Sequence, residues 1–284
     1  MDSALTRQAL PARWGFSAWL ACFNGIVWRE ILRFVHQKER FLSALVRPLV
    51  WLFIFAAGFR QVLGVSIIPP YETYVLYEVF VTPGLIGMIL LFNAMQSSLS
   101  MVYDRETGAM RTLLISPFPR WFLLVSKLVG GVFVAFLQVY VFLLIAYAWE
   151  IEPPPIGYLT VLPALFLSGL MLGALALFIS SVIRQLENFA GVMNFVIFPM
   201  FFASSALYPL WRIREASPLL YEICRFNPFT YAVELIRFAL YGQLDPVSLA
   251  AVLGFLTIFL AGALYAYDPS KGLLGRRGAP GGAA

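Results

Sequence analysis

Hydrophobic residues are grouped along the chain into six long stretches that contain few or no charged residues. A helix needs about 20 mainly apolar residues to cross about 30 Å of hydrocarbon. None of the stretches shows the alternation of apolar and polar residues that a membrane barrel requires. The pattern therefore predicts six transmembrane helices. They lie over Phe41–Leu63, Val79–Met101, Trp121–Ala148, Tyr158–Ile183, Phe189–Leu210 and Val247–Tyr267.

An amphipathic pattern precedes the first of these stretches. Between Phe16 and Arg40, apolar residues recur at helical spacing, and residues such as Arg33 and His36 occupy the opposite face. This pattern predicts a helix lying in the membrane interface, with His36 on its polar face and not bound to a metal. A short seventh span is the alternative. The charges of Arg29, Glu30 and Arg33 disfavour it, because each costs about 2.5–3.5 kcal/mol at the bilayer centre.

A third pattern covers residues 211–244, which are too apolar for a loop and too interrupted for a span. Pro218, Pro228 and Gly242 divide this segment into two short helical pieces, and Asn227 before Pro228 is a helix-start signal. Non-helical backbone enters a membrane only where protein or a wet cavity surrounds it. We therefore expect a re-entrant helical hairpin that enters from the outer side. A helix lying on the outer interface is the alternative.

Two opposite charges within this hairpin are candidates for a functional pair. Glu234 and Arg237 are three residues apart, so they share one helix face. A lone charge at membrane depth is costly, and pairing or access to water lowers that cost. We expect an outer gate formed by Asn227, Pro228, Glu234 and Arg237.

The composition supports a membrane protein. Hydrophobic residues make up 61% of the 284 residues and charged residues 12%. A soluble domain has about 45–50% apolar residues and about 25% charged residues. The mean hydropathy of +0.81 agrees. The expected fold class is an all-α integral membrane protein, without room for a separate soluble enzyme domain. The expected divisions are an N-terminal segment (1–40), a transmembrane domain (41–268) and a disordered cytoplasmic tail (269–284).

The basic residues indicate how the spans are oriented. Of the 20 Lys and Arg residues, 15 fall on the side that carries both termini. Because cytoplasmic loops are enriched in Lys and Arg, both termini are predicted to be cytoplasmic. The net charge of +5 forms no separate basic domain, so nucleic acid is not expected as a partner.

The sequence contains few residues suited to catalysis or metal binding. It has no G-x-x-x-x-G-K-[ST], HExxH, CxxC or GxSxG motif, one histidine, and two cysteines that the topology places on opposite faces. We expect no catalytic residue, metal site, disulfide or bound cofactor. Acidic residues deep within the six spans are absent, which weakens the case for a proton- or sodium-coupled transporter. An energy source is therefore expected from a partner.

A charged insert separates the second and third stretches, over residues 102–120. It reads as a short cytoplasmic helix that Asp104 caps, with charged residues on its surface, an apolar end and terminating prolines. Such a segment is suited to being gripped by a partner protein. The residues expected to form this contact are Asp104, Arg105, Glu106, Gly108, Arg111, Leu113, Leu114 and Pro117.

The insert resembles that of the membrane subunit, or permease, of type-2 ABC exporters, which carries E-R-E-x-G-T-L-E-x-L-L-x-x-P. Here it stands as DRETGAMRTLLISP, followed by Lys127 in the next span. The segments NFVIFPMFFASSALYPL and FNPFTYAVELIRFALYG are also similar to family segments ahead of the last span. Ala109 and Arg111 depart from the family pattern, so the partner's pocket is expected to carry a complementary change.

This resemblance implies a permease without its own ATPase site. ATP would be bound by a separate ABC ATPase subunit docked on residues 102–120, and a second permease copy would complete a homodimer in the bacterial inner membrane. The cargo classes implied are amphiphiles, glycans, lipid-linked molecules and drugs, with membrane lipid as the surrounding partner. The alternatives are an ion-coupled transporter, a structural membrane partner or a lipid-modifying enzyme.

Overall fold

The computed structural model describes residues 15–36, 38–59, 69–71, 74–106, 118–183 and 186–266. The expected all-helical architecture is confirmed for this part of the chain, which forms ten helices. They are α1 (Phe16–His36), α2 (Lys38–Phe59), α3 (Tyr77–Glu106), α5 (Arg120–Ala148), α6 (Gly157–Val182), α7 (Leu186–Phe202), α8 (Leu210–Ala216), α9 (Pro218–Phe226), α10 (Pro228–Leu240) and α11 (Pro246–Ala266).

Four of these helices, α3, α5, α6 and α11, are long and apolar enough to cross a membrane. Helices α2 and α7 coincide with the other two expected spans, but their described apolar stretches are shorter, at Leu45–Ile54 and Gly191–Phe202. The structure therefore supports a multi-pass membrane protein. The expectation of six spans stays a prediction.

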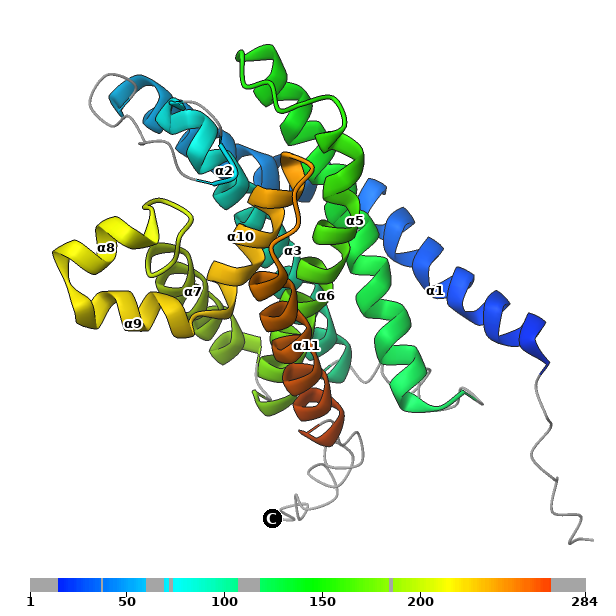
Figure 1. Ribbon diagram of the computed structural model, residues 1–284. Coiled ribbons are helices and arrows are strands. Elements are labelled where there is room, and N and C mark those ends of the chain that lie inside the picture. Colours follow the sequence, from blue (N-terminus) through cyan, green and yellow to red (C-terminus); the bar gives the residue numbers. More distant parts are fainter. Residues whose placement is uncertain are drawn as a thin grey trace, which may run out of the picture.

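Helix α3 occupies the centre of the bundle. Its most apolar 18-residue window is 94% buried, whereas that of α11 is 17% buried. Helices α2, α5, α6, α7 and α10 all pack against α3, while α11 packs mainly against α6 at the periphery (Figure 1). A helix that is apolar on every side needs neighbours on every side in a protein interior. Helix α11 therefore leaves most of its apolar surface for lipid.

Small residues permit the closest approaches between these helices. A side chain on Gly84 of α3 would lie 2.7 Å from the backbone oxygen of Ala206, in the turn after α7. A side chain on Gly157, at the start of α6, would lie 2.0 Å from the backbone oxygen of Leu240. Small residues at such contacts let backbones approach where lipid provides no hydrophobic driving force.

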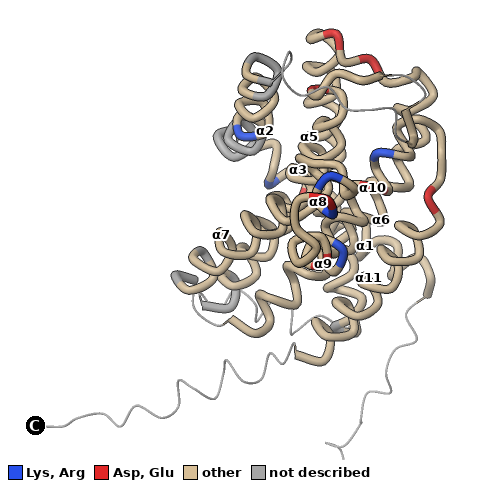
Figure 2. The backbone as a smooth tube through the Cα atoms, turned by 60° about the vertical axis from the view of Figure 1, so that its left-hand side comes forward, with Lys and Arg blue, Asp and Glu red and all other residues tan. Residues whose placement is uncertain are grey.

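The segment before α11 differs from the expected hairpin of two helical pieces. It forms three helices, because Leu210–Ala216 is helical as well and Ser217 separates it from α9. Helices α8 and α9 are largely exposed and carry a group of charged positions, whereas the long helices carry few (Figure 2). Helix α10 instead packs between α3, α6 and α11. Its entry into a membrane from the outer side stays a prediction.

Two further expectations need correction. The fifth expected span was extended to Leu210, but α7 ends at Phe202 and a turn follows. The amphipathic helix expected to reach Arg40 ends at His36, and α2 begins at Lys38. The helix itself is present, and it lies diagonally beside α5 (Figure 1).

The packing of Gly84 leads to a first prediction. In the Gly84→Ala variant, the added methyl group meets the backbone of Ala206 at 2.7 Å, so one segment must move. Overpacking of this kind costs about 1–3 kcal/mol. We expect a lower thermal unfolding midpoint for the protein in detergent. Gly254→Ala is the matched control, because no atom lies within 4 Å of its added methyl group. Equal midpoints for the two variants would contradict the close contact.

Candidate functional site

Asn227 joins the start of α10 to the end of α7. Its Oδ1 accepts a hydrogen bond from the backbone N–H of Phe229 at 3.0 Å. Its Nδ2 donates to the carbonyls of Met200 at 2.7 Å and Ala203 at 2.6 Å. The last carbonyls of a helix lack partners within that helix, so Asn227 caps α10 and satisfies the end of α7. The predicted helix start at Asn227 and Pro228 is confirmed.

Arg237 is buried in the interior, with 2% of its surface exposed. Its Nη1 donates to the carboxylate of Glu234, and its Nη2 donates to the carbonyl of Ser205 at 2.8 Å. The guanidinium also lies 4.2 Å from the ring centre of Phe80 on α3. The predicted pairing of Glu234 with Arg237 is confirmed. The alternative, an exposed helix on the outer interface, is not supported for α10, because most of its residues are buried.

Two tyrosines border this group outside the long helices. Tyr71 precedes α3 and is buried, and its ring packs edge-on against Tyr241 with centroids 4.9 Å apart. Burial raises the pKa of the Tyr71 phenol well above its usual range and raises the pKa of Tyr241 to about 12. Both phenols therefore stay neutral well above pH 7 and are uncharged polar neighbours of the Arg237–Glu234 pair.

The expected partner-binding insert is only partly described. Helix α3 extends to Glu106, so Asp104, Arg105 and Glu106 form its last turn. The expectation that Asp104 caps a separate helix is wrong, because α3 continues through that residue. The remaining candidate residues lie outside the described residues. They are Gly108, Arg111, Leu113, Leu114 and Pro117.

The last residues of the insert and the first turn of α5 pack against the start of α1. The ring of Trp19 lies 5.2 Å from that of Phe118, 4.7 Å from that of Phe122 and 6.2 Å from that of Trp121, between centroids. Aromatic pairs at such distances stabilise by about 0.5–1.5 kcal/mol beyond the burial of their surface. This cluster attaches α1 to the first turn of α5. The amphipathic pattern predicted α1 but not this attachment.

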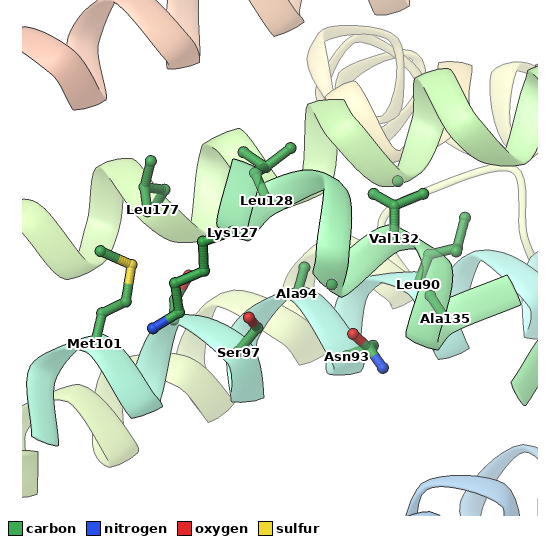
Figure 3. Close-up of a pocket in the computed structure, with 14 residues that line it drawn as sticks. Leu90, Asn93, Ala94, Ser97, Met101, Lys127, Leu128, Val132, Ala135 and Leu177 are labelled. Atoms are coloured by element: carbon green, nitrogen blue, oxygen red, sulfur yellow. The ribbon is translucent and has the colours of Figure 1, made fainter. Parts of the chain in front are cut away.

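Polar residues also meet deep within the bundle, where the sequence analysis placed no site. Asn93 on α3 donates a hydrogen bond to Gln138 on α5 at 2.8 Å, and both side chains are buried. One turn further along α3, Ser97 and Ser98 line a cavity together with Lys127 of α5. Figure 3 shows the Lys127 side chain directed along this cavity between Met101 and Ser97.

Glu30 of α1 approaches the same region from the other side. Glu30 is 8% exposed and packs against Gly130 of α5. A Cβ atom added to Gly130 would lie 3.3 Å from the Cβ and Cγ atoms of Glu30. We call Glu30, Asn93, Ser97, Ser98 and Lys127 the polar seam. The signal that was available in the sequence is the occurrence of amides, serines and a lysine within apolar stretches, since such residues are costly in a membrane.

Comparison with known proteins identifies the kind of chain that carries this arrangement. A family model described as ABC-2 type transporter matches residues 22–241. A relative named as a transport permease, ycf38 of Cyanophora paradoxa, is 28% identical over 215 residues, which is 72% of this chain and 70% of the relative.

Two further relatives differ in how much of each chain they match. A relative named as a multidrug ABC transporter permease, YbhR of Escherichia coli strain K12, is 31% identical over 165 residues, or 57% of this chain and 43% of that protein. Nodulation protein J of Neorhizobium galegae is 22% identical over 273 residues, which is 90% of this chain and 92% of that protein.

The geometry around Asn227 leads to a second prediction. The Asn227→Asp variant keeps the cap on α10 but replaces the N–H donors that face Met200 and Ala203 with a carboxylate oxygen. A buried acceptor left without its donor costs about 1–3 kcal/mol. We expect a clear loss of thermal stability in detergent. Ser217→Ala, which removes only the single cap at the exposed start of α9, should cost about 1 kcal/mol. A smaller loss for Asn227→Asp than for Ser217→Ala would contradict this role.

Proposed function

The chain belongs to the ABC-2 type transporter family, and from this premise we propose that it is the permease subunit of an ATP-driven exporter. The family match across most of the helical bundle is the observation that carries this proposal. Energy comes from a separate ABC ATPase subunit, because no phosphate-binding loop occurs in the sequence. The proposed substrate is an amphiphilic, glycan, lipid-linked or drug-like molecule, in keeping with a relative named for multidrug transport.

We place the permease in a bacterial inner membrane with both termini in the cytoplasm. The excess of Lys and Arg on one side of the spans supports this orientation. A second permease copy completes the proposed transporter as a homodimer. Exposed phenylalanines on α7, among them Phe195, Phe198 and Phe202, are consistent with an apolar surface available for a partner or for lipid.

The ATPase is proposed to dock on residues 102–120. This insert connects the central helix α3 to α5, and α1 packs on the start of α5 through Trp19. Closure of the ATPase subunits would thus act on three packed helices together. Arg105 and Glu106 supply charged contacts in this proposal, and Leu113 and Leu114 supply apolar contacts.

A charge-reversal experiment tests the function and the docking surface together. We expect the double variant Arg105→Glu with Glu106→Arg to lose ATPase binding and transport while the permease still folds, because like charges would face each other in the contact. The measurements are pull-down of the ATPase in mild detergent and ATP-dependent transport in proteoliposomes.

The matched control for this experiment reverses an exposed pair elsewhere, Glu222→Arg with Arg225→Glu on α9. These two side chains are 50% and 61% exposed, and they lie 3.8 Å apart. The control should bind the ATPase and transport normally. Unchanged ATPase binding and transport in the Arg105 and Glu106 double variant would refute the docking surface. If neither the unaltered protein nor any variant pulled down an ATPase, the proposed exporter function itself would be refuted.

We further propose that Asn227, Pro228, Glu234 and Arg237 form the outer gate. The buried Arg237 holds α10 against α3 and the turn after α7. Release of these contacts would let α10 move relative to both. The Asn227–Pro228 turn would act as the fixed point from which α10 moves.

Single cysteines at positions 229–241, in a background without Cys22 and Cys224, test the gate. We expect an impermeant thiol reagent added outside to label the half-buried position 241 more strongly than the buried positions that follow the Asn227–Pro228 turn. Labelling at 234 and 237 should change when nucleotide is trapped on the ATPase, because the gate is proposed to open then. Uniform labelling that nucleotide does not alter would mean that α10 gates nothing.

A further inference from the structure

Two small cavities, each partly open to the surface of the bundle, lie on either side of the contact between α3 and α5. The first is lined by polar seam residues Asn93, Ser97, Ser98 and Lys127 and has a volume of about 30 Å³. The second, also about 30 Å³, is lined by Glu30, Arg33, Asn93, Ser97 and Ser100. Asn93, Ser97 and Gly131 border both cavities. The two spaces are therefore neighbours that share polar groups of Asn93 and Ser97.

The region brings opposite charges into the interior from two helices. Glu30 of α1 is 8% exposed and Lys127 of α5 is 5% exposed. Removing charges from water is costly unless hydrogen bonds and opposite charges compensate. Cavities that remain empty in proteins are lined by apolar side chains, whereas polar cavities hold water that bonds to the lining groups. The lining here is mixed: most of the residues around the first cavity are apolar, and Asn93, Ser97, Ser98 and Lys127 supply the polar partners that a bound water needs.

The size and charge of the region distinguish water from other occupants. One water needs about 10–15 Å³ in this measure and two to four polar partners, so each cavity has room for about two waters. A metal cation is disfavoured in the second cavity because Arg33 lines it and Nη2 of Arg29 lies 3.3 Å from the Glu30 carboxylate. Arg29 and Arg33 already compensate the charge of Glu30, which is the one acidic residue that lines this cavity.

We propose that the two cavities form one internal hydration site, whose ordered waters connect Glu30 of α1, through Ser97 and Asn93 of α3, to Lys127 of α5. The water adds hydrogen bonds to both charged side chains beyond the contacts that these side chains make within the protein. The waters thus join neighbouring helices, as the Asn93–Gln138 hydrogen bond joins α3 and α5.

This hydration also affects how the helices move. Hydrogen bonds to water re-form after a small displacement and are nearly as favourable as direct bonds, whereas interdigitated apolar side chains must separate to slide. The seam thus gives α1, α3 and α5 a contact that tolerates relative movement. The inferred tolerance of helix movement rests on the proposed coupling function. The inferred presence of water in the cavities does not depend on that function.

Millisecond X-ray radiolysis of the full-length protein in detergent, read by mass spectrometry, tests the site. Hydroxyl radicals form on water beside the side chains they oxidise. Met101 lines the first cavity, whereas Met88 and Met95 on the same helix line neither, and all three are buried. We expect Met101 to be oxidised several-fold faster than Met88 and Met95.

Two variants separate internal water from bulk water at the end of α3. Ser97→Leu fills the border of both cavities. Gly131→Ala is the milder variant, because its methyl group makes an ordinary contact of 3.4 Å with Ser97 Oγ. We expect oxidation of Met101 to fall to the rate of the control methionines in Ser97→Leu and to fall partly in Gly131→Ala.

Two results would overturn the proposal. Oxidation of Met101 at the rate of Met88 and Met95 in the unaltered protein would mean that the cavities are dry. Rapid oxidation of Met101 that neither variant lowers would mean that bulk water reaches it. Because the measurement uses the permease alone, its outcome is independent of ATPase binding and transport, which test the proposed function separately.

Discussion

The packing of α10 against α3 and the turn after α7 depends on the contacts of the buried Arg237 guanidinium. Removal of one partner from a buried ion pair is costly, typically about 3–5 kcal/mol, because a charge is left without compensation. Arg237 contacts Glu234 within α10, the carbonyl of Ser205 in the turn after α7, and the ring of Phe80 on α3. Three segments far apart in the sequence must therefore be in place together.

The same requirement explains why α7 stops where it does. Beyond Phe202 the chain remains apolar, and hydropathy alone would allow the helix to continue. The carbonyls of Met200 and Ala203 instead accept hydrogen bonds from Asn227, and the hydroxyl of Tyr77 donates to the carbonyl of Leu207 at 2.7 Å. In a medium without water each backbone carbonyl needs a partner from the protein. These side chains supply partners, so an irregular turn is tolerated inside the bundle.

The sequence was informative where one physical effect dominates. The predicted span Val247–Tyr267 corresponds to α11 at Pro246–Ala266, because an apolar helix at the periphery is defined by its length in lipid. The start of α10 was predictable because Asn227 and Pro228 act locally. Glu30 was not, since the sequence shows it only as one charge among several. Its burial depends on Gly130 of a helix that begins 90 residues later, and one-dimensional patterns contain no such information.

The arrangement of the two polar regions on α3 limits how the bundle can change shape. Phe80 beside Arg237 and Met101 beside the polar seam are separated by 21 residues of one helix, which is about 30 Å at about 1.5 Å per residue. From Pro83 to Leu91 the residues of α3 are apolar and buried, and packed interiors yield little to compression or sliding. Displacement at the Glu106 end of α3 is therefore transmitted along the helix and not absorbed within it. The contacts able to rearrange are the polar ones, around Arg237 near the start of α3 and along the polar seam from Asn93 onward, where hydrogen bonds can exchange partners.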